Sequence, residues 1–265
     1  MRIDAASAPG SAQRPNEDWI SVSLPASGQG GSLVVLDGVT PPRDDAGCVH
    51  DVPWFTARLG GALIELSGSR RDLTLRDVLA EGIRRTADAH RGTCDLSHVR
   101  TPQATVVLAR WGDGPDGVVE YLVLSDSTLL LESDDGSVTA LLDDRLDRLP
   151  PEALRTHASA DALRNAEGGF FTAAADPAVA ARAVAGSVPR AGLRAVAALT
   201  DGASRWVDLF ARGDWAECAA VLRKEGARAL IDRVRALETE AVAGRGGVVP
   251  RWKAHDDASA VYAEF

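Results

Sequence analysis

Short apolar runs separated by glycine, proline and serine divide the beginning of the chain. Runs of this length are typical of strands, and they cover residues 2–6, 19–24 and 32–36. Farther along, residues 54–66 and 72–91 carry apolar side chains three and four positions apart, a spacing that indicates helices. The beginning of the chain therefore predicts three strands followed by two helices in succession.

The rest of the chain mixes the two patterns. A strand meander is predicted over residues 104–110, 118–124, 127–132 and 138–142, with hairpin turns at 112–115 and 134–136. A short helix with an irregular stretch is expected within 150–166, a strand at 170–174, and a helix at 177–185 that Asp176 caps and Pro177 begins. Residues 193–199 are apolar almost throughout, like a strand covered on both faces. Helices are predicted over 204–210 and 215–237, followed by a flexible glycine-rich stretch at 244–247 and a last strand at 259–264.

This order of elements favours one α+β domain over residues 1–265. No internal repeat is evident, and no linker separates two halves with independent cores. Two antiparallel sheets flanked by helices, in a four-layer α-β-β-α sandwich, would bury these elements well. We therefore expect that architecture.

Acidic residues lie where predicted strands begin or end. Asp37 directly follows the strand at 32–36, and Asp201 directly follows the strand at 193–199. Asn16-Glu17-Asp18 and Asp256-Asp257 precede other strands. An isolated Asp-Gly pair is usually only a turn, but several carboxylates that converge in a partly buried site repel one another unless cations neutralise them. Hard divalent cations prefer oxygen ligands, so the set indicates a Mg²⁺ or Mn²⁺ site.

Composition narrows the function classes. The formal net charge of −9 argues against a general nucleic-acid binder or a protein of anionic membrane surfaces. No apolar run is long enough to span a bilayer, and the first ten residues lack the apolar core of a signal peptide. A cytoplasmic protein is therefore the expectation.

The cysteines indicate reduced thiols. Cys48, Cys94 and Cys218 are odd in number and widely spaced, which fits no disulfide scaffold and no familiar zinc-ligand spacing. We expect each to be a small packing residue. His50 is expected to lie at the surface or to pack within a loop, and His90 to lie in a helix without a partner.

The acidic segments resemble those of a known protein family in both residue identity and order along the chain. The matching segments are Asn16-Glu17-Asp18, Asp37-Gly38, Ser125-Asp126-Ser127, Thr200-Asp201-Gly202 and His255-Asp256-Asp257-Ala258-Ser259. Together they resemble the metal-dependent serine/threonine protein phosphatases of the PPM, or type 2C, family, in a divergent bacterial form. The resemblance covers nearly the whole chain, and Thr105 lies in the strand that precedes the Gly-Asp-Ser turn of that family.

The resemblance implies a centre of two Mn²⁺ or Mg²⁺ ions, with a weaker third. Its implied ligands are Glu17, Asp18, Asp37, Gly38, Asp126, Asp201 and Asp256. Asp37 is expected to bridge two ions, with the Gly38 carbonyl on one of them. Asp201 and Asp256 complete the first ion's shell.

Other residues have separate implied roles. Glu17 serves the second ion directly or through its waters, with Asp18 as a further candidate, and Asp126 helps to hold the third ion together with Asp201. The implied chemistry is hydrolysis by a water whose pKa the ions lower, with an arginine neutralising the phosphate. The expected catalytic residues are Arg14, Asp37 and Asp201.

Three departures from the family pattern concern substrate capture and rate. The phosphate-binding arginine usually stands four residues before the glutamate, where this chain has Gln13; Arg14 and Arg43 are the two candidates to replace it. The turn at Ser125 lacks the arginine that usually ends it, and the loop after Gly38 lacks the usual glycine-rich turn ending in histidine.

Three functions remain open at this point. The first is an active phosphatase whose partner is a protein phosphorylated on serine or threonine, within a cognate kinase pathway. The second is a catalytically weak relative that serves as a binding or regulatory module. A phosphoesterase for small phosphate esters is the third. Retention of Asp37, Asp201 and Asp256 favours an enzyme, because a binding module has no need of mutually repelling carboxylates; the altered loop after Gly38 favours the module.

Overall fold

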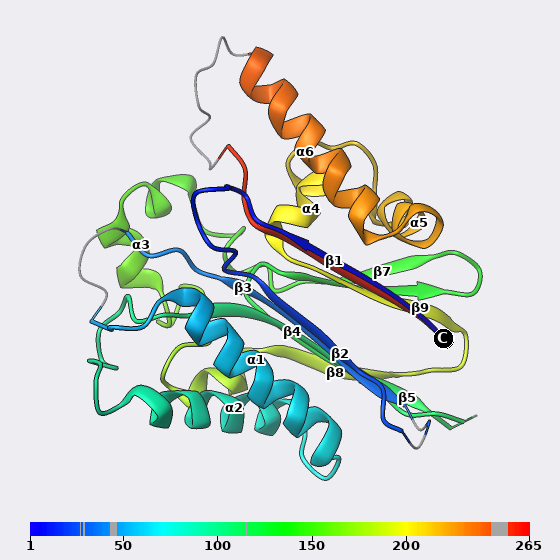
Figure 1. Cartoon of the computed structure of the whole chain (residues 1–265), viewed down its shortest axis with the longest axis horizontal. Coiled ribbons are helices and arrows are strands. Elements are labelled where there is room, and N and C mark those ends of the chain that lie inside the picture. Colours follow the sequence, from blue (N-terminus) through cyan, green and yellow to red (C-terminus); the bar gives the residue numbers. More distant parts are fainter. Residues whose placement is uncertain (27, 29, 43–46, 115, 245–253) are drawn as a thin grey trace.

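The first of two antiparallel sheets has the strand order β2-β3-β4-β5-β8 in the computed structural model, which describes residues 1–26, 28, 30–42, 47–114, 116–244 and 254–265. Its strands are β2 (Trp19–Ser23), β3 (Gly31–Gly38), β4 (Ala104–Trp111), β5 (Val118–Leu124) and β8 (Val184–Pro189). Helices α1 (Val52–Ser69) and α2 (Leu75–His90) cover the outer face of this sheet (Figure 1). Leu63 and Ile83 of these helices pack with Val34 and Leu108 of the strands in one buried cluster.

The second sheet has the strand order β1-β10-β9-β6-β7. Its strands are β1 (Arg2–Ala8), β6 (Thr128–Ser133), β7 (Val138–Leu141), β9 (Leu193–Leu199) and β10 (Ala258–Glu264). Helices α4 (Asp201–Asp208), α5 (Trp215–Glu225) and α6 (Ala227–Gly244) cover its outer face. Leu222 and Leu230 pack there with Leu199 and Tyr262.

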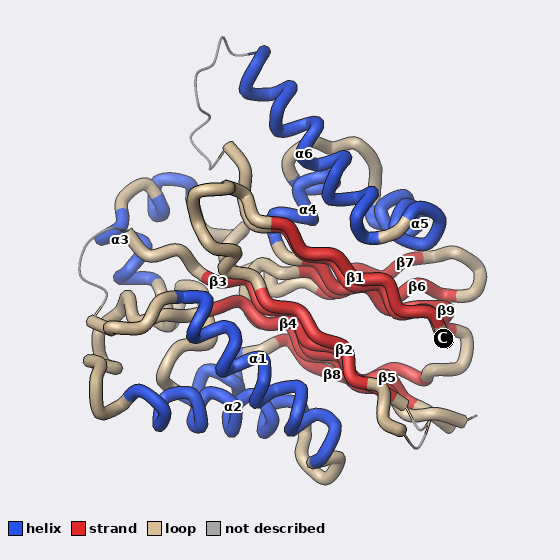
Figure 2. Tube along the Cα trace, in the orientation of Figure 1, coloured by secondary structure: helices blue, strands red, loops and turns tan. Residues whose placement is uncertain are grey.

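The inner faces of the sheets form a third core. Val35 and Val107 of one sheet lie in the same buried cluster as Val196 and Val261 of the other. Figure 2 shows the two layers of strands stacked between two layers of helices. The predicted four-layer α-β-β-α sandwich is confirmed, and among the described residues no helix is both long and apolar enough to cross a membrane.

The predicted meander is wrong at its centre. β4 and β5 belong to one sheet, whereas β6 and β7 belong to the other. The chain changes sheets at Ser125, whose φ of 70° turns the backbone sharply. Strands buried in either sheet are equally apolar, so the sequence pattern does not show this change. The crossover places Asp126 between the sheets.

The segment at 215–237 is two helices rather than one. Gly226, with a φ of 94°, separates α5 from α6, and the Asp4 carboxylate of β1 accepts a hydrogen bond from Ala227 N at 2.9 Å. Asp4 thus caps α6 from a strand far away in the sequence. The apolar periodicity continues across Gly226, which hid the break.

The segment at 170–185 also differs from its prediction. Residues 170–174 form only isolated bridges, and Pro177–Arg182 is a 3₁₀ helix, although Asp176 does cap it through Ala178 N. β8 follows directly and was not predicted, because glycine, serine and proline interrupt its apolar pattern. Two further short helices, a 3₁₀ helix at Pro151–Leu154 and α3 (His157–Leu163), complete this region.

Candidate functional site

The predicted acidic residues are contributed by both sheets. Asp37 lies at the end of β3 and pairs with Thr105 of β4. The Thr105 hydroxyl contacts the Ser127 hydroxyl at 2.5 Å, which holds the crossover segment containing Asp126 beside this strand end. Asp201 begins α4 directly after β9, and Asp256 lies just before β10, the neighbour of β9. The antiparallel pairing thus brings residues far apart in the sequence to one end of the sandwich.

Burial and neighbouring negative charges act together on these carboxyl groups. Removal from water raises the pKa of Asp37 well above its ordinary value, and the charges of Asp201, Asp18, Asp126 and Asp256 raise it further. Burial and the nearby acidic groups likewise raise the pKa of Asp18 to about 8 and that of Asp126 to about 7. Without a cation, burial therefore favours the neutral form of Asp18, Asp37 and Asp126.

Asp18 offers an oxygen atom suited to a cation. The Thr200 hydroxyl donates a hydrogen bond to Asp18 Oδ2 at 3.0 Å, whereas Oδ1 is buried and has no hydrogen-bond partner among the described residues. A buried carboxylate oxygen without a partner is costly, and a divalent ion would satisfy it. The oxygen donors present therefore fit Mg²⁺ or Mn²⁺, although the carboxylates do not form a closed ligand shell. In the described part of the chain, the one group of possible ligands that all lie within 4.8 Å of one another is a Cys/His group elsewhere.

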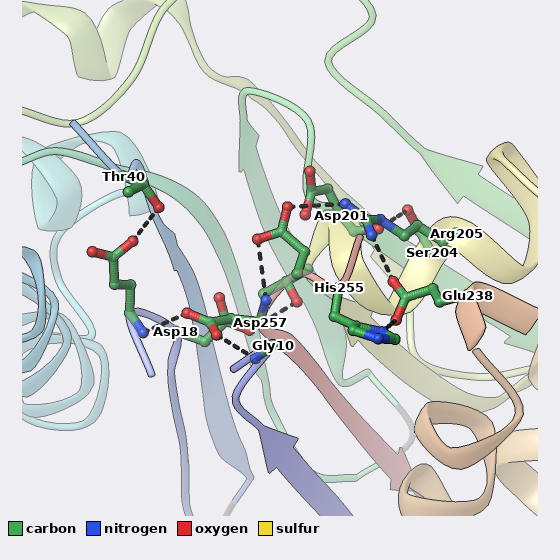
Figure 3. A network of polar contacts seen from close by, with 12 residues as sticks. Gly10, Asp18, Thr40, Asp201, Ser204, Arg205, Glu238, His255 and Asp257 are labelled. Atoms are coloured by element: carbon green, nitrogen blue, oxygen red, sulfur yellow. Dashed lines mark hydrogen bonds and ion pairs between the residues drawn. The ribbon is translucent and has the colours of Figure 1, made fainter. Parts of the chain in front are cut away.

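Glu17 is held in place by two residues that the sequence did not single out for this role. Asp257 accepts hydrogen bonds from Gly10 N and Glu17 N, each at 2.7 Å. The Thr40 hydroxyl, in the loop after β3, donates to the Glu17 carboxylate. The Asp257 carboxylate thus fixes the backbone of Glu17, and Thr40 orients its side chain (Figure 3).

Asp256 belongs to a buried charge network that sequence reasoning missed. Arg205 of α4 contacts Asp256 at 3.0 Å and Glu238 of α6 at 2.6 Å. Glu238 also accepts from Arg235 at 2.8 Å and contacts His255 Nδ1 at 2.7 Å. Figure 3 shows Arg205 beside Glu238, which lies next to His255. The network fixes Asp256 but places a cation beside a predicted metal ligand.

Two cavities adjoin the carboxylates. One, of about 440 Å³, is acidic and is lined by Asp126, Asp143, Asp147, Asp201, Arg205 and Asp208 among others. The other, of about 250 Å³, is lined by Arg14, Glu17, Thr40, Asp256 and Asp257 among others. Arg14 is exposed and lines the same cavity as the predicted ligands Glu17 and Asp256. Arg43 falls outside the described residues.

We expect the protein, in buffer without Mg²⁺ or Mn²⁺, to become less stable as the pH rises. Because the pKa of Asp18 is raised from 3.8 to about 8 and that of Asp126 to about 7, their contribution to stability is full below pH 3.8 and is lost as the pH rises through those values. Carboxylates in ion pairs contribute to the pH dependence at lower pH. Hydrogen bonds from Arg84 and Arg85, for example, lower the pKa of Glu81 to about 2, so the stability that this group contributes is lost only as the pH falls toward that value. Urea unfolding between about pH 5 and 8 measures the effect. Asp18→Asn should flatten the profile, and a wild-type midpoint that rises over this range would contradict the expectation.

Comparison with known proteins gives a match in structure but none in sequence. No protein-family model matches the chain, and no curated protein matches its sequence. The serine/threonine phosphatase Stp1 of Staphylococcus aureus superimposes with a TM-score of 0.61 at 13% identity, over 99% of this chain and 94% of that one. The Mycobacterium tuberculosis serine/threonine phosphatase PstP/Ppp gives a TM-score of 0.62 at 19% identity, over 100% and 98%.

A third similar structure is that of a PPM phosphatase. The PPM Ser-Thr phosphatase MsPP of Mycobacterium smegmatis, solved in complex with cacodylate, gives a TM-score of 0.58 at 14% identity, over 100% of this chain and 98% of that one. Matches that extend over whole chains include both sheets and the helices that flank them. At these identities the likeness shows the architecture: this chain has the fold of the bacterial PPM serine/threonine phosphatases.

Proposed function

We propose that this protein is a metal-dependent phosphatase that hydrolyses phosphoserine and phosphothreonine in protein substrates. The observation that carries the proposal is the gathering of acidic side chains at one end of the two sheets, where Asp126 and Asp201 line one cavity and Glu17 and Asp256 another. Burial, together with the nearby carboxylates, raises the pKa of Asp37 there. Keeping several carboxylates near one another in a partly buried site is costly unless the site binds cations. The fold it shares with PPM phosphatases supports the same reaction class.

The ligands that we propose for two Mn²⁺ or Mg²⁺ ions and a weaker third are Glu17, Asp18, Asp37, Gly38, Asp126, Asp201 and Asp256. Such ions, when bound, supply a water of lowered pKa and neutralise the phosphate charge. The chain's own groups prepare the site. Asp257 and Thr40 hold Glu17, and Thr200 fixes one oxygen of Asp18 so that its other oxygen remains for a ligand role.

The proposal is tested by phosphate release from a phosphothreonine peptide. Activity should require added Mn²⁺ or Mg²⁺, disappear with a chelator and return when the ion is restored. Asp201→Asn should lack activity under every condition, because it replaces a ligand charge while preserving side-chain size. Metal-independent release, or full activity in Asp201→Asn, would exclude the proposed site.

Arg14 is the proposed cation for the substrate phosphate. It lines a cavity with Glu17 and Asp256, and a guanidinium there can present two donors to phosphate oxygens. Arg14→Ala should lower kcat/KM by about 10- to 100-fold, the loss of a charge-assisted contact of about 1.5–3 kcal/mol, and leave metal affinity unchanged. The matched control is Arg228→Ala on the exposed face of α6. Unchanged kinetics in Arg14→Ala together with a large loss in Arg43→Ala would assign the role to Arg43.

One observation favours the alternative of a catalytically weak binding or regulatory module. The Arg205 guanidinium contacts Asp256 Oδ2 at 3.0 Å, where it competes with a metal ion for the carboxylate. If the module is correct, the peptide assay should give no turnover at saturating Mn²⁺, while the fold stays intact.

A further inference from the structure

Two cysteines and two histidines meet beside the helices of the first sheet. Cys48 Sγ lies 3.6 Å from His50 Nδ1 and 3.4 Å from His90 Nδ1. Cys94 Sγ lies 3.4 Å from His50 Nδ1, and the four ligand atoms all lie within 4.8 Å of one another. The expectation that each cysteine only packs is correct for Cys218, which is buried in α5, but does not describe Cys48 and Cys94.

Local structure brings the two halves of the group together. Cys48 and His50 directly precede α1, which Asp51 caps, whereas His90 ends α2 and Cys94 lies in the turn that follows it. Cys94 N donates a hydrogen bond to His90 O at 3.1 Å, which holds Cys94 close to His90. Asp95 N donates to Gly47 O at 2.7 Å and joins the two segments.

The burial of His90 is unusual for a histidine without a ligand role. It is only 2% exposed, and its Nε2 has no hydrogen-bond partner among the described residues. Its Nδ1 instead points to the thiol of Cys48, a weak hydrogen-bond partner. The indole ring of Trp54 stacks on His50 at 3.9 Å and lies 5.2 Å from His90, so one side of the group is closed by an aromatic ring. Burying a polar ring is costly when its nitrogens make few hydrogen bonds, so another interaction is needed to stabilise His90 in this position.

We propose that Cys48, His50, His90 and Cys94 bind one structural Zn²⁺ ion. Zinc binds cysteine sulfur at about 2.3 Å and histidine nitrogen at about 2.0–2.1 Å in a tetrahedron, whose ligand atoms are then separated by about 3.3–3.8 Å. The three contacts of 3.4–3.6 Å match that spacing without a change in fold. Two thiolates and two imidazoles in a tetrahedron select zinc over Mg²⁺ or Mn²⁺, which prefer oxygen ligands. With four protein ligands the site has no open position for a substrate, so its role is structural.

The position of the ion gives it a specific task. It joins the beginning of α1 to the end of α2, the two helices that cover the sheet containing Asp37. It also holds the segment at Cys48 and His50, just before α1, against the turn that follows α2, where Asp95 N donates to Gly47 O.

The test is metal analysis of the native protein, purified in reducing buffer and kept in excess Mg²⁺ so that the acidic site is filled. Wild type should hold about one equivalent of zinc, and Cys94→Ser less than about a tenth. The matched control Cys218→Ser removes a buried thiol in another layer and should keep its zinc. Removing zinc from wild type with a zinc-selective chelator should lower Tm by roughly 10 °C, as loss of a tightly bound ligand does.

Cobalt provides a readout that does not depend on a variant that folds. Co²⁺ in the four-ligand site should give intense thiolate-to-cobalt charge-transfer absorption, which carboxylate ligands cannot give, together with the visible bands of a tetrahedral ion. The proposal is overturned if wild type holds no zinc and shows no such cobalt spectrum, or if the native protein contains a Cys48–Cys94 disulfide. Equal zinc in Cys94→Ser and Cys218→Ser would also overturn it. None of these readouts depends on phosphatase activity.

Discussion

Asp37→Asn should lower phosphatase activity by about 1,000-fold or more, the loss expected when several kcal/mol of Lewis-acid catalysis disappear. The asparagine amide cannot bridge two cations as a carboxylate can. In the absence of metal, however, the variant should fold at least as well as wild type. Burial and the charges of Asp201 and Asp18 disfavour the charged form of Asp37 and raise its pKa, so a neutral amide of the same shape relieves both effects.

The two effects separate a metal ligand from a structural residue. In thermal melts, excess Mn²⁺ should raise the Tm of wild type by mass action but leave that of Asp37→Asn unchanged. The control, Asp232→Asn, alters an exposed ion pair on α6 and should behave like wild type in both assays. A Mn²⁺ response retained by Asp37→Asn would remove Asp37 from the ligand set.

Arg205→Leu should have the largest effect on stability outside the apolar core. Arg205 is 8% exposed and contacts both Asp256 and Glu238, and Glu238 is itself 1% exposed. Removing one partner of a buried charge network typically costs about 3–5 kcal/mol, and the lower end is expected because Arg235 and His255 still contact Glu238. The free energy of unfolding in urea measures this loss.

The same substitution should strengthen Mn²⁺ binding in the folded protein, because Asp256 no longer shares its carboxylate with a guanidinium. The control, Arg233→Leu, removes the exposed ion pair between Arg233 of α6 and Glu225 of α5 and should cost less than about 1 kcal/mol. Equal losses in the two variants would show that the buried network contributes no more than a surface pair. Weaker Mn²⁺ binding in Arg205→Leu would show that Arg205 positions Asp256 rather than competing for it.

Much of the architecture could be predicted from the sequence, because the apolar period that identifies a strand or helix is local. What could not be predicted depended on partners far away in the chain. The sheet change at Ser125 leaves the apolar pattern intact, and the break at Gly226 is stabilised by Asp4, a residue of the first strand.

The candidate site shows the same limit. The ordered acidic segments identified Asp37, Asp126, Asp201 and Asp256, which the structure couples electrostatically. Arg205 lies outside every motif, and only the packing of α4 against α6 brings it to Glu238. Likewise, Cys48-X-His50 and His90-X₃-Cys94 are separated by two helices, so no compact zinc spacing exists in the sequence. The sequence alone showed only that cysteine and histidine recur near the beginning of one predicted helix and the end of the next.

The most direct test of the central claim, that the carboxylates around Asp37 bind the catalytic metals, is anomalous diffraction from crystals grown with Mn²⁺. Data collected on both sides of the manganese absorption edge distinguish manganese from zinc at the Cys/His group. We predict two manganese peaks about 3.5–4 Å apart, with Asp37 between them and Asp201 and Asp256 bound to one of them. The absence of a manganese peak within bonding distance of Asp37 at saturating Mn²⁺ would contradict the claim.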